Sequence, residues 1–596
     1  MVPTTLRSWH GGPILAALLV IGCSKPESSG TQNASASTRP STAISTAPPT
    51  GSPVPPPPVG PGAMAPRLRA LGNELLLTWI EPVATTSHKT RTKRHRVRFS
   101  RLVEATWTPA ATISEGAEVV ANWADAPSAM RGGDGALVAS WAEKSGDKAY
   151  AYDVVLGRST DGGTTWTRLG LAHDDGTASE HGFVSLIREA NGVRAFWLDG
   201  RLTATKDTAG HAGSMTLRTG MVSSDGVTRS ELVDSRTCDC CGTSAVSTSR
   251  GPLVAYRDRS ETEVRDIAVV RRGGGDWGRP RPLHVDGWTV PGCPVNGPML
   301  AVEGDRVAAA WYTYVNGQAR VRAAISPDGG ATFGDATEVA SPAGRSAPIG
   351  RVDVVSYGDG AVVSWLASER EEATIFVARV APDGRVGDRL TVARTQAGRQ
   401  SGFPQLERLG DQLVVVWTEP GEPSHVALKT LRSADLPAPL ARRSAPDGSV
   451  SRLLAAGAEA PDYRAHHLDG SDVALSSLRG KVVLLNLWAT WCEPCRHELS
   501  ALKALHQRFV GKDVAVVAVS LDAERDVVAR YVERRELPFA VWHDPRDRAS
   551  AAFGVDVIPA TFVIDTAGRV AWSKSGAVSE GEPGLVEAIE TAGAQR

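Results

Sequence analysis

The stretch KVVLLNLWATWCEPCRHE, residues 481–498, decides the architecture of the C-terminal part of the chain. Its first eight residues are almost all apolar, which predicts a buried strand over Lys481–Trp488. Two cysteines separated by two residues follow, and apolar spacing then predicts a helix over Pro494–Phe509. Cys492 and Cys495 are therefore expected at a strand-to-helix junction.

The elements beyond this junction continue the same alternation. A second buried strand is predicted over Val514–Ser520, and a second helix over Ala523–Arg535. Strands that alternate with helices are typical of a sheet covered by helices. We therefore predict an α/β domain at residues 453–596.

The position of the two cysteines predicts their chemistry. Free amide groups and the dipole at a helix start stabilise a thiolate, and CxxC thiols there commonly ionise at pH ~7 or below. Cys492 is the predicted nucleophile that attacks a disulfide, and Cys495, one turn on and less exposed, resolves the mixed disulfide. Pro494 suits the first turn because no amide donor is needed there. A zinc site is disfavoured because the domain holds no further cysteine.

Three motifs within Ala460–Gly576 resemble the extracytoplasmic TlpA/ResA group of membrane-tethered, thioredoxin-fold thiol-disulfide oxidoreductases. They are Leu478–Val483, Trp488–Arg496 and Val557–Asp565. The resemblance implies that Pro559 is cis and lies beside the dithiol, where backbone near Ile558 can pair with a client chain. It also implies that Glu498 tunes thiol ionisation, with a solvated helix carboxylate as the alternative. The residues expected to contact a client are Trp491, Glu493, Pro494 and Ile558.

The same resemblance implies the direction and the partners of the reaction. Reduction of a disulfide-containing client protein is favoured over oxidation, a membrane thiol donor is expected upstream, and a part in cytochrome c maturation is suggested. No cofactor is required for this chemistry. Nucleic acid is set aside as a partner, because 65 basic residues face 66 acidic ones and the formal net charge is -1.

The middle of the chain, residues 64–435, is repetitive. Apolar runs that end in an aromatic residue recur about every 55 residues, and each is flanked by turn residues and further short strands. This pattern predicts an all-β propeller of six or seven blades, with seven favoured. The runs are Leu75–Trp79, Ala136–Trp141, Val193–Trp197, Leu253–Tyr256, Val307–Trp311, Ala361–Trp365 and Leu413–Trp417.

Two turns in this region, 159–166 and 326–333, resemble the Asp box of sialidase-like propellers. An Asp side chain there can accept backbone amides and Gly permits positive φ, so we expect these turns to hold the fold. Phe196–Arg201 also resembles sialidase-like proteins. The arginine cluster, acid and tyrosine nucleophile of a sialidase cannot be placed, so binding or scaffolding is favoured over glycoside hydrolysis.

The propeller region carries four cysteines: Cys238, Cys240, Cys241 and Cys293. Two structural disulfides are favoured in an oxidising compartment, and because a vicinal bond is strained, we expect Cys293 to join one of the three clustered sulfurs. A thiolate site for copper or zinc is the alternative. A second function follows, in which the propeller is a glycan- or protein-binding module and the redox domain maintains its cysteines.

The N-terminus predicts export and anchoring. Residues 1–22 carry an apolar run too short to span a bilayer and resemble a bacterial lipoprotein signal, which implies lipidation of Cys23. Residues 23–63 are a Ser/Thr/Pro-rich tether, and residues 436–452 are a polar linker. We therefore expect a membrane-anchored lipoprotein of the bacterial cell envelope, facing the periplasm or the exterior.

Overall fold

The computed structural model describes residues 53–84, 93–148, 150–203, 213–224, 226–315, 317–343, 346–439, 453–490, 492–522, 524–545, 547–555 and 558–594. The chain divides into Met1–Thr46 and a compact unit of Ala47–Arg596. The predicted signal, Cys23, most of the tether, most of the linker and Trp491 lie outside the described residues. Among the helices of the described part, none is both long and apolar enough to cross a membrane.

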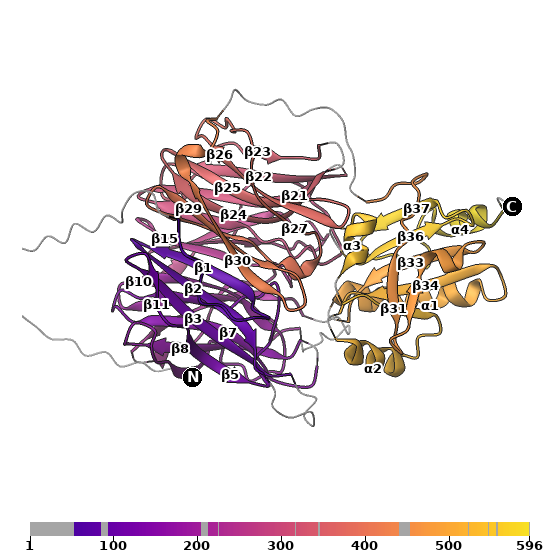
Figure 1. Cartoon of the computed structure of the whole chain (residues 1–596), viewed down its shortest axis with the longest axis horizontal. Coiled ribbons are helices and arrows are strands. Elements are labelled where there is room, and N and C mark those ends of the chain that lie inside the picture. The colour runs from indigo at the N-terminus through magenta and orange to yellow at the C-terminus, as the bar shows by residue number, and fades with distance from the viewer. Residues whose placement is uncertain are drawn as a thin grey trace, which may run out of the picture. The chain divides into compact units, whose positions relative to one another are not determined.

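Seven antiparallel sheets follow one another along the chain before the C-terminal domain begins (Figure 1). The seven-bladed propeller is thereby confirmed. Blades 1 to 3 are β1 (Met64–Leu71), β2 (Glu74–Pro82), β3 (His95–Val103), β4 (Thr106–Trp107) and β5 (Ala111–Gly116); β6 (Ser128–Arg131), β7 (Leu137–Lys144), β8 (Tyr152–Ser159) and β9 (Thr167–Leu171); and β10 (His181–Glu189), β11 (Gly192–Asp199), β12 (Thr216–Ser223), β13 (Gly226–Val227) and β14 (Glu231–Asp234).

The other four blades have the same antiparallel order. They are β15 (Ser244–Thr248), β16 (Gly251–Arg257), β17 (Ile267–Gly273), β18 (Asp276–Trp277) and β19 (Arg281–Pro282); β20 (Met299–Glu303), β21 (Arg306–Val315), β22 (Gln318–Ser326) and β23 (Thr337–Ala340); β24 (Ala347–Tyr357), β25 (Gly360–Glu369), β26 (Glu372–Val380) and β27 (Leu390–Gln396); and β28 (Gln405–Leu409), β29 (Gln412–Glu419) and β30 (His425–Arg432). Short 3-10 turns lie at Arg399–Ser401 and Ser433–Asp435.

Each predicted aromatic run lies in the second strand of its blade. Because residues i and i+2 of a strand share a face, an acid two positions after a tryptophan can accept its indole N–H. Four blades use this arrangement, with Nε1–O distances of 2.6 to 2.9 Å at Trp79–Glu81, Trp141–Glu143, Trp197–Asp199 and Trp417–Glu419. In these four blades the motif is Trp-x-acid, and the acid satisfies a donor that burial would otherwise leave unpaired.

The propeller closes on itself through its first and last blades. Leu77 and Trp79 of β2 form one buried apolar cluster with Val414 and Val416 of β29. Such a contact removes the exposed sheet faces that an open array would leave at its two ends. Blade 1 therefore packs against both blade 2 and blade 7.

The two glycine-rich turns hold the fold as expected. Asp161 accepts hydrogen bonds from the backbone amides of Thr164 and Thr165, both at 3.0 Å. Gly162 and Gly163 have φ of 76° and 92°, a conformation that glycine adopts without a steric cost. The closing Trp166 packs edge-on against Phe99 of the preceding blade, so the turn fastens two blades together.

The C-terminal domain is built on one seven-stranded sheet of order β32-β31-β35-β34-β33-β36-β37, in the orange and yellow part of Figure 1. Its central strand β33 runs parallel to β34 and antiparallel to β36. The elements are β31 (Arg464–His467), β32 (Asp472–Ala474), a 3-10 turn at Leu475–Leu478, β33 (Val482–Trp488), α1 (Glu493–Arg508), β34 (Val514–Ser520), α2 (Arg525–Arg535), β35 (Ala540–His543), α3 (Arg548–Phe553), β36 (Ala560–Ile564), β37 (Val570–Ser575) and α4 (Leu585–Ala594). The thioredoxin fold predicted from the sequence is confirmed.

Candidate functional site

The dithiol lies where β33 gives way to α1, as the sequence predicts. Cys492 is the N-cap of α1, and its sulfur accepts a hydrogen bond from the Cys495 amide at 3.3 Å. The two cysteines form a disulfide. Pro494 occupies the first turn of α1 without removing a hydrogen bond that the helix would use. A thiolate at Cys492 would therefore lie on the free amides of a helix start.

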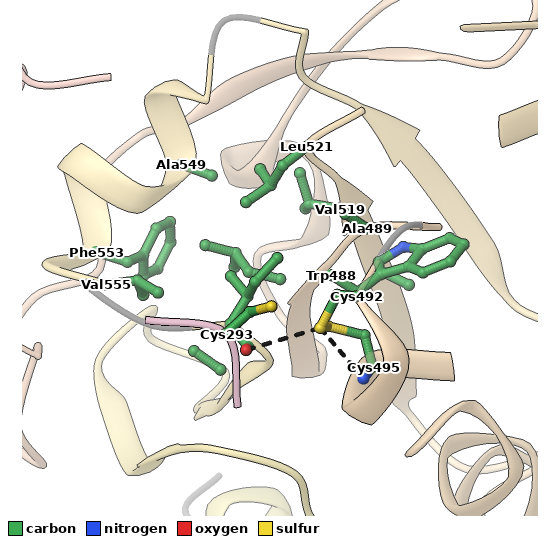
Figure 2. Close-up of a cluster of buried hydrophobic side chains, with 14 of the residues drawn as sticks. Cys293, Trp488, Ala489, Cys492, Cys495, Val519, Leu521, Ala549, Phe553 and Val555 are labelled. Atoms are coloured by element: carbon green, nitrogen blue, oxygen red, sulfur yellow. Dashed lines mark hydrogen bonds between the residues drawn. A yellow bond between two sulfur atoms is a disulfide. The ribbon is translucent and has the colours of Figure 1, made fainter. Parts of the chain in front are cut away.

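The proline loop lies opposite the dithiol. The Ile558–Pro559 peptide bond is cis, and β36 begins directly after it, with Ala560 in register with Leu487 of β33. This register brings the Ile558 carbonyl oxygen to 3.7 Å from the Cys492 sulfur, as the dashed line in Figure 2 shows. The backbone next to Pro559 thus lies beside the sulfur that the sequence predicts to be the nucleophile.

Glu498 is buried beneath the dithiol, one turn further along α1, with a relative exposure of 2%. Its carboxylate accepts hydrogen bonds from Asn486 Nδ2 at 2.9 Å, Thr561 Oγ1 at 3.1 Å and the Val578 amide at 2.9 Å. Burial raises its pKa to about 7, and the three donors only partly oppose that shift. The solvated alternative for Glu498 is wrong, and this acid titrates near neutral pH.

A second buried carboxylate holds the segment before the dithiol and was missed by sequence reasoning. Asp522, just after β34, accepts hydrogen bonds from the Thr490 amide at 2.9 Å, the Thr490 hydroxyl at 2.6 Å and the Ser520 hydroxyl at 2.7 Å. Burial raises the pKa of Asp522 above its usual value. The available signal was an acid directly after a buried strand, at the same sheet edge as the CxxC segment.

Propeller residues cover the dithiol. The Cys293 amide donates to the Ile558 oxygen at 3.0 Å, and the two residues form an antiparallel bridge. Two further contacts join the propeller to the C-terminal domain: Gln400 Nε2 donates to the Pro545 oxygen at 2.8 Å, and Arg399 lies 3.2 Å from the carboxylate of Asp547.

This cover changes the exposure of the catalytic pair. Cys492 and Cys495 both have 0% relative exposure, so the prediction that Cys495 is the less exposed of the two is wrong. The reason is that buried residues of the propeller and of the C-terminal domain, both cysteines included, form one continuous apolar cluster. Trp491 lies outside the described residues, as does the side chain of Glu493.

The propeller cysteines pair differently from the prediction. Cys238 forms a disulfide with Cys241, whereas Cys240 and Cys293 are free and buried, so the expected bond from Cys293 to the cluster is absent from this part of the structure. Cys238 and Cys241 are three residues apart, so their bond closes a short loop. The distant Cys293 segment stays where its amide donates to the Ile558 oxygen.

Several described groups have the composition of a metal site. The sulfurs of Cys238, Cys240 and Cys241 lie within 4.8 Å of one another, and two groups of histidine and aspartate in blades 2 and 3 are equally close. The copper or zinc site that the sequence left as the alternative for the cysteines stays a prediction.

Comparison with known proteins matches the C-terminal domain. Residues 456–573 match the model of the AhpC/TSA family. The chain is 34% identical over 133 residues to the thiol-disulfide oxidoreductase ResA of Oceanobacillus iheyensis, covering 22% of this chain and 69% of that protein. It is 36% identical over 117 residues to the ResA of Geobacillus thermodenitrificans, covering 20% of this chain and 67% of the relative.

Solved structures are similar to the same part of the chain. A putative thiol:disulfide interchange protein DsbE from Chlorobium tepidum shares 32% identity, with a TM-score of 0.22, over 23% of this chain and 98% of that one. A putative thiol-disulfide oxidoreductase from Bacteroides vulgatus shares 26% identity, with a TM-score of 0.22, over 24% of this chain and 99% of that one.

Proposed function

The chain belongs, through its C-terminal domain, to the ResA family of thiol-disulfide oxidoreductases, and on that premise we propose that it is an extracytoplasmic, membrane-anchored reductase of protein disulfides. The observation that carries the proposal is the arrangement of the dithiol, with Cys492 capping α1 and the Ile558–Pro559 loop beside it. In this reading the propeller recruits or orients the client protein.

The chemistry needs only residues of the chain. The Cys492 thiolate attacks one sulfur of the client disulfide, the client S–S bond breaks, and a mixed disulfide with Cys492 forms. Cys495 then attacks Cys492, which releases the client as a dithiol and leaves the Cys492–Cys495 disulfide that the structure holds. A membrane thiol donor would restore the reduced pair.

Glu498 has the properties of a group that moves the proton in the second step. Its pKa of about 7 lets it take or give a proton near neutral pH, and it lies on the same helix as Cys495, one turn further on. Because Glu498 is buried, the proton it holds is shielded from bulk water.

The direction of electron flow is tested by the reduction potential of the Cys492–Cys495 pair in the full chain. Differential alkylation and peptide mass spectrometry, after equilibration in defined thiol buffers, report this pair separately from the other cysteines. A potential near ~-270 mV supports a reductase, whereas a value near ~-120 mV makes the protein an oxidant and overturns the proposed direction.

The envelope location rests on the lipoprotein-like N-terminus, and a part in cytochrome c maturation rests on the TlpA/ResA resemblance. Metabolic labelling with a palmitate analogue tests the first: incorporation that is lost in Cys23→Ser supports the anchor, and unlabelled protein contradicts it. A haem-stained profile of c-type cytochromes that is unchanged on deletion of the gene contradicts the second.

The second candidate function is that the propeller binds a glycan or a protein. The two Asp-bearing turns support a propeller scaffold and do not themselves indicate a binding site. Glycan-array binding by the full chain, unchanged by Cys492→Ser, would support it. Release of fluorophore from a sialoside over a broad pH range would instead revive the less favoured sialidase activity.

A further inference from the structure

Cys293 occupies the place where a client strand would be held against the dithiol. Its amide donates to the Ile558 oxygen at 3.0 Å in an antiparallel bridge, and the same oxygen lies 3.7 Å from the Cys492 sulfur. Figure 2 shows the Cys293 side chain beside the Cys492–Cys495 pair. A propeller cysteine and the predicted nucleophile therefore share one carbonyl group as a neighbour.

The segment that carries Cys293 is held in place from within the propeller. The buried Arg257 donates from Nε to the Asn296 oxygen at 2.8 Å. Asn296 in turn donates from Nδ2 to the Pro294 oxygen at 3.2 Å and accepts from the Arg351 amide at 2.7 Å. A segment fixed by this many buried bonds is preorganised to meet the Ile558 loop.

Cys240 is the immediate partner of Cys293. Burial by itself would raise the pKa of the Cys240 thiol, but the hydrogen bond from Cys293, the charge of the buried Arg265 and the Val295 amide together bring that pKa below its usual value. The same hydrogen bond and burial raise the pKa of Cys293.

We propose that Cys240 and Cys293 form a second redox pair, whose disulfide is the built-in substrate of the Cys492–Cys495 dithiol. The proposal rests on the proposed function of the C-terminal domain and names a client within the chain itself. The propeller then both covers the dithiol and receives electrons from it.

The exchange balances without a further reactant. The Cys492 thiolate attacks Cys293, the Cys240–Cys293 bond breaks, and its electron pair leaves on Cys240, beside Arg265. Cys495 then attacks Cys492, the Cys293–Cys492 bond breaks, and Cys293 takes the proton that Cys495 loses. Two electrons pass from the dithiol to the propeller pair.

The cysteines in the structure are arranged as they would be after these two exchange steps. The Cys492–Cys495 pair is a disulfide, whereas Cys240 and Cys293 are free, and Cys293 is hydrogen-bonded to Cys240. The proposal requires a Cys240–Cys293 disulfide before the exchange, whereas both cysteines are free in this structure.

The test uses the full chain with Cys495→Ser, which leaves Cys492 unable to complete the second step. After mild oxidation with oxidised glutathione, a digest without reductant is searched for cross-linked peptides. We expect a Cys492–Cys293 cross-link in most of the protein, lost when Cys293→Ser is added. The matched control adds Cys238→Ser and Cys241→Ser instead, which should preserve the cross-link.

Insulin reduction by the unmodified chain distinguishes a failure of the internal substrate from a failure of the proposed function. Absence of the Cys492–Cys293 cross-link, or a cross-link from Cys492 to another propeller cysteine, overturns the internal substrate if insulin is still reduced. Absence of both the cross-link and insulin reduction overturns the proposed function as well.

A separate cluster in blades 2 and 3 carries a second, independent inference. His173 and His181 stack face to face with ring centroids 3.6 Å apart, and their side chains are 1% and 0% exposed. Asp153 lies 3.4 Å from one ring, and Asp175 and Asp199 lie 3.2 and 3.8 Å from the other. Of these residues, sequence reasoning noted only Asp199, within the sialidase-like segment Phe196–Arg201, because the others come from distant strands and loops.

In each ring of the cluster, one nitrogen carries a lone pair that faces a carboxylate. His181 Nδ1 faces the Ser179 oxygen and His173 Nδ1 faces Asp175, so each must donate there. In a neutral ring the remaining Nε2 is then a lone pair, which faces Asp175 from His181 and Asp153 from His173. Neither Nε2 has a hydrogen-bond partner among the described residues.

Protonating both rings would stack two like charges at 3.6 Å, and protonating only His181 would still leave the His173 Nε2 lone pair facing Asp153. Arg201 contributes a cation to the cluster, at 2.7 Å from Asp199, 3.6 Å from Asp175 and 3.1 Å from Asp174. We infer that a divalent cation of borderline softness, such as Zn²⁺, binds between the imidazoles and the carboxylates.

Zinc added alone to the chelator-treated full chain is the probe. We expect one bound equivalent whose X-ray absorption spectrum fits only nitrogen and oxygen ligands at ~2.0–2.2 Å. Binding should be lost in His181→Asn and kept in His425→Asn, an exposed propeller histidine. Sulfur ligands at ~2.3 Å, or no bound zinc in the unmodified chain, would overturn the site.

Discussion

Replacing Glu498 by glutamine should remove most of the pH dependence of the C-terminal domain's stability between pH 5 and pH 8. The folded pKa of about 7 lies above the ordinary glutamate pKa of 4.5, so the folded state holds a proton that the unfolded chain has released. Stability is therefore full below pH ~4.5 and falls as pH rises toward and through 7. A separation of this size corresponds to roughly 3 kcal/mol lost by pH 8.

The glutamine variant keeps the shape of the side chain and loses the titration. Its carbonyl can still accept from Val578 and Thr561, whereas its amide must face the Asn486 donor, which costs about 1 kcal/mol at all pH values. The expected result is a variant that is less stable than the parent at pH 5 and more stable at pH 8.

The assay is urea unfolding at the two pH values, with the C-terminal transition followed by hydrogen exchange of β33 and β36 amides. Glu580→Gln, at an exposed position of the same domain, is the matched control and should track the parent protein. Parallel pH dependence in the parent and in Glu498→Gln would refute the reasoning, because another group would then carry the titration.

Three further outcomes are expected. Cys492→Ser should lower insulin reduction to the uncatalysed rate, and activity within tenfold of the parent would mean that another thiol is the nucleophile. Arg265→Met should slow alkylation of Cys240 at pH 7, because the thiolate loses a buried cation; an unchanged rate–pH profile contradicts that role. Trp79→Phe should lower the propeller's stability by about 1 kcal/mol more than Trp365→Phe, because only Trp79 donates an indole hydrogen bond that phenylalanine cannot replace; equal melting temperatures would contradict this.

Local spacing accounts for most of the fold. The CxxC at the end of an apolar run predicted the junction of β33 and α1, and Val514–Ser520 was placed with the bounds of β34. The recurring aromatic runs predicted six or seven blades, with seven favoured, because the second strand of each blade carries large buried side chains at a regular interval. These features depend on residues close together in the chain.

The acids that complete the site were harder to place. Glu498 was seen as either buried or solvated, since its position on α1 is compatible with both. Asp522 was missed, because its role depends on the parallel pairing of β33 with β34, which brings Trp488 level with Ser520. Whether a polar side chain is buried depends on which surfaces of the fold pack together, and residue spacing along the chain does not indicate that packing.

The sequence by itself determined the chemistry: a dithiol on a helix start, a proline loop to face it and a propeller of repeated strands before it. Tertiary structure decided which sulfurs meet. Cys293 reaches Ile558 because the propeller packs on the C-terminal domain, and the sequence alone does not indicate this contact. The physical reason is that helix starts and strand repeats are set by neighbours along the chain, whereas exchange partners are set by distance in space.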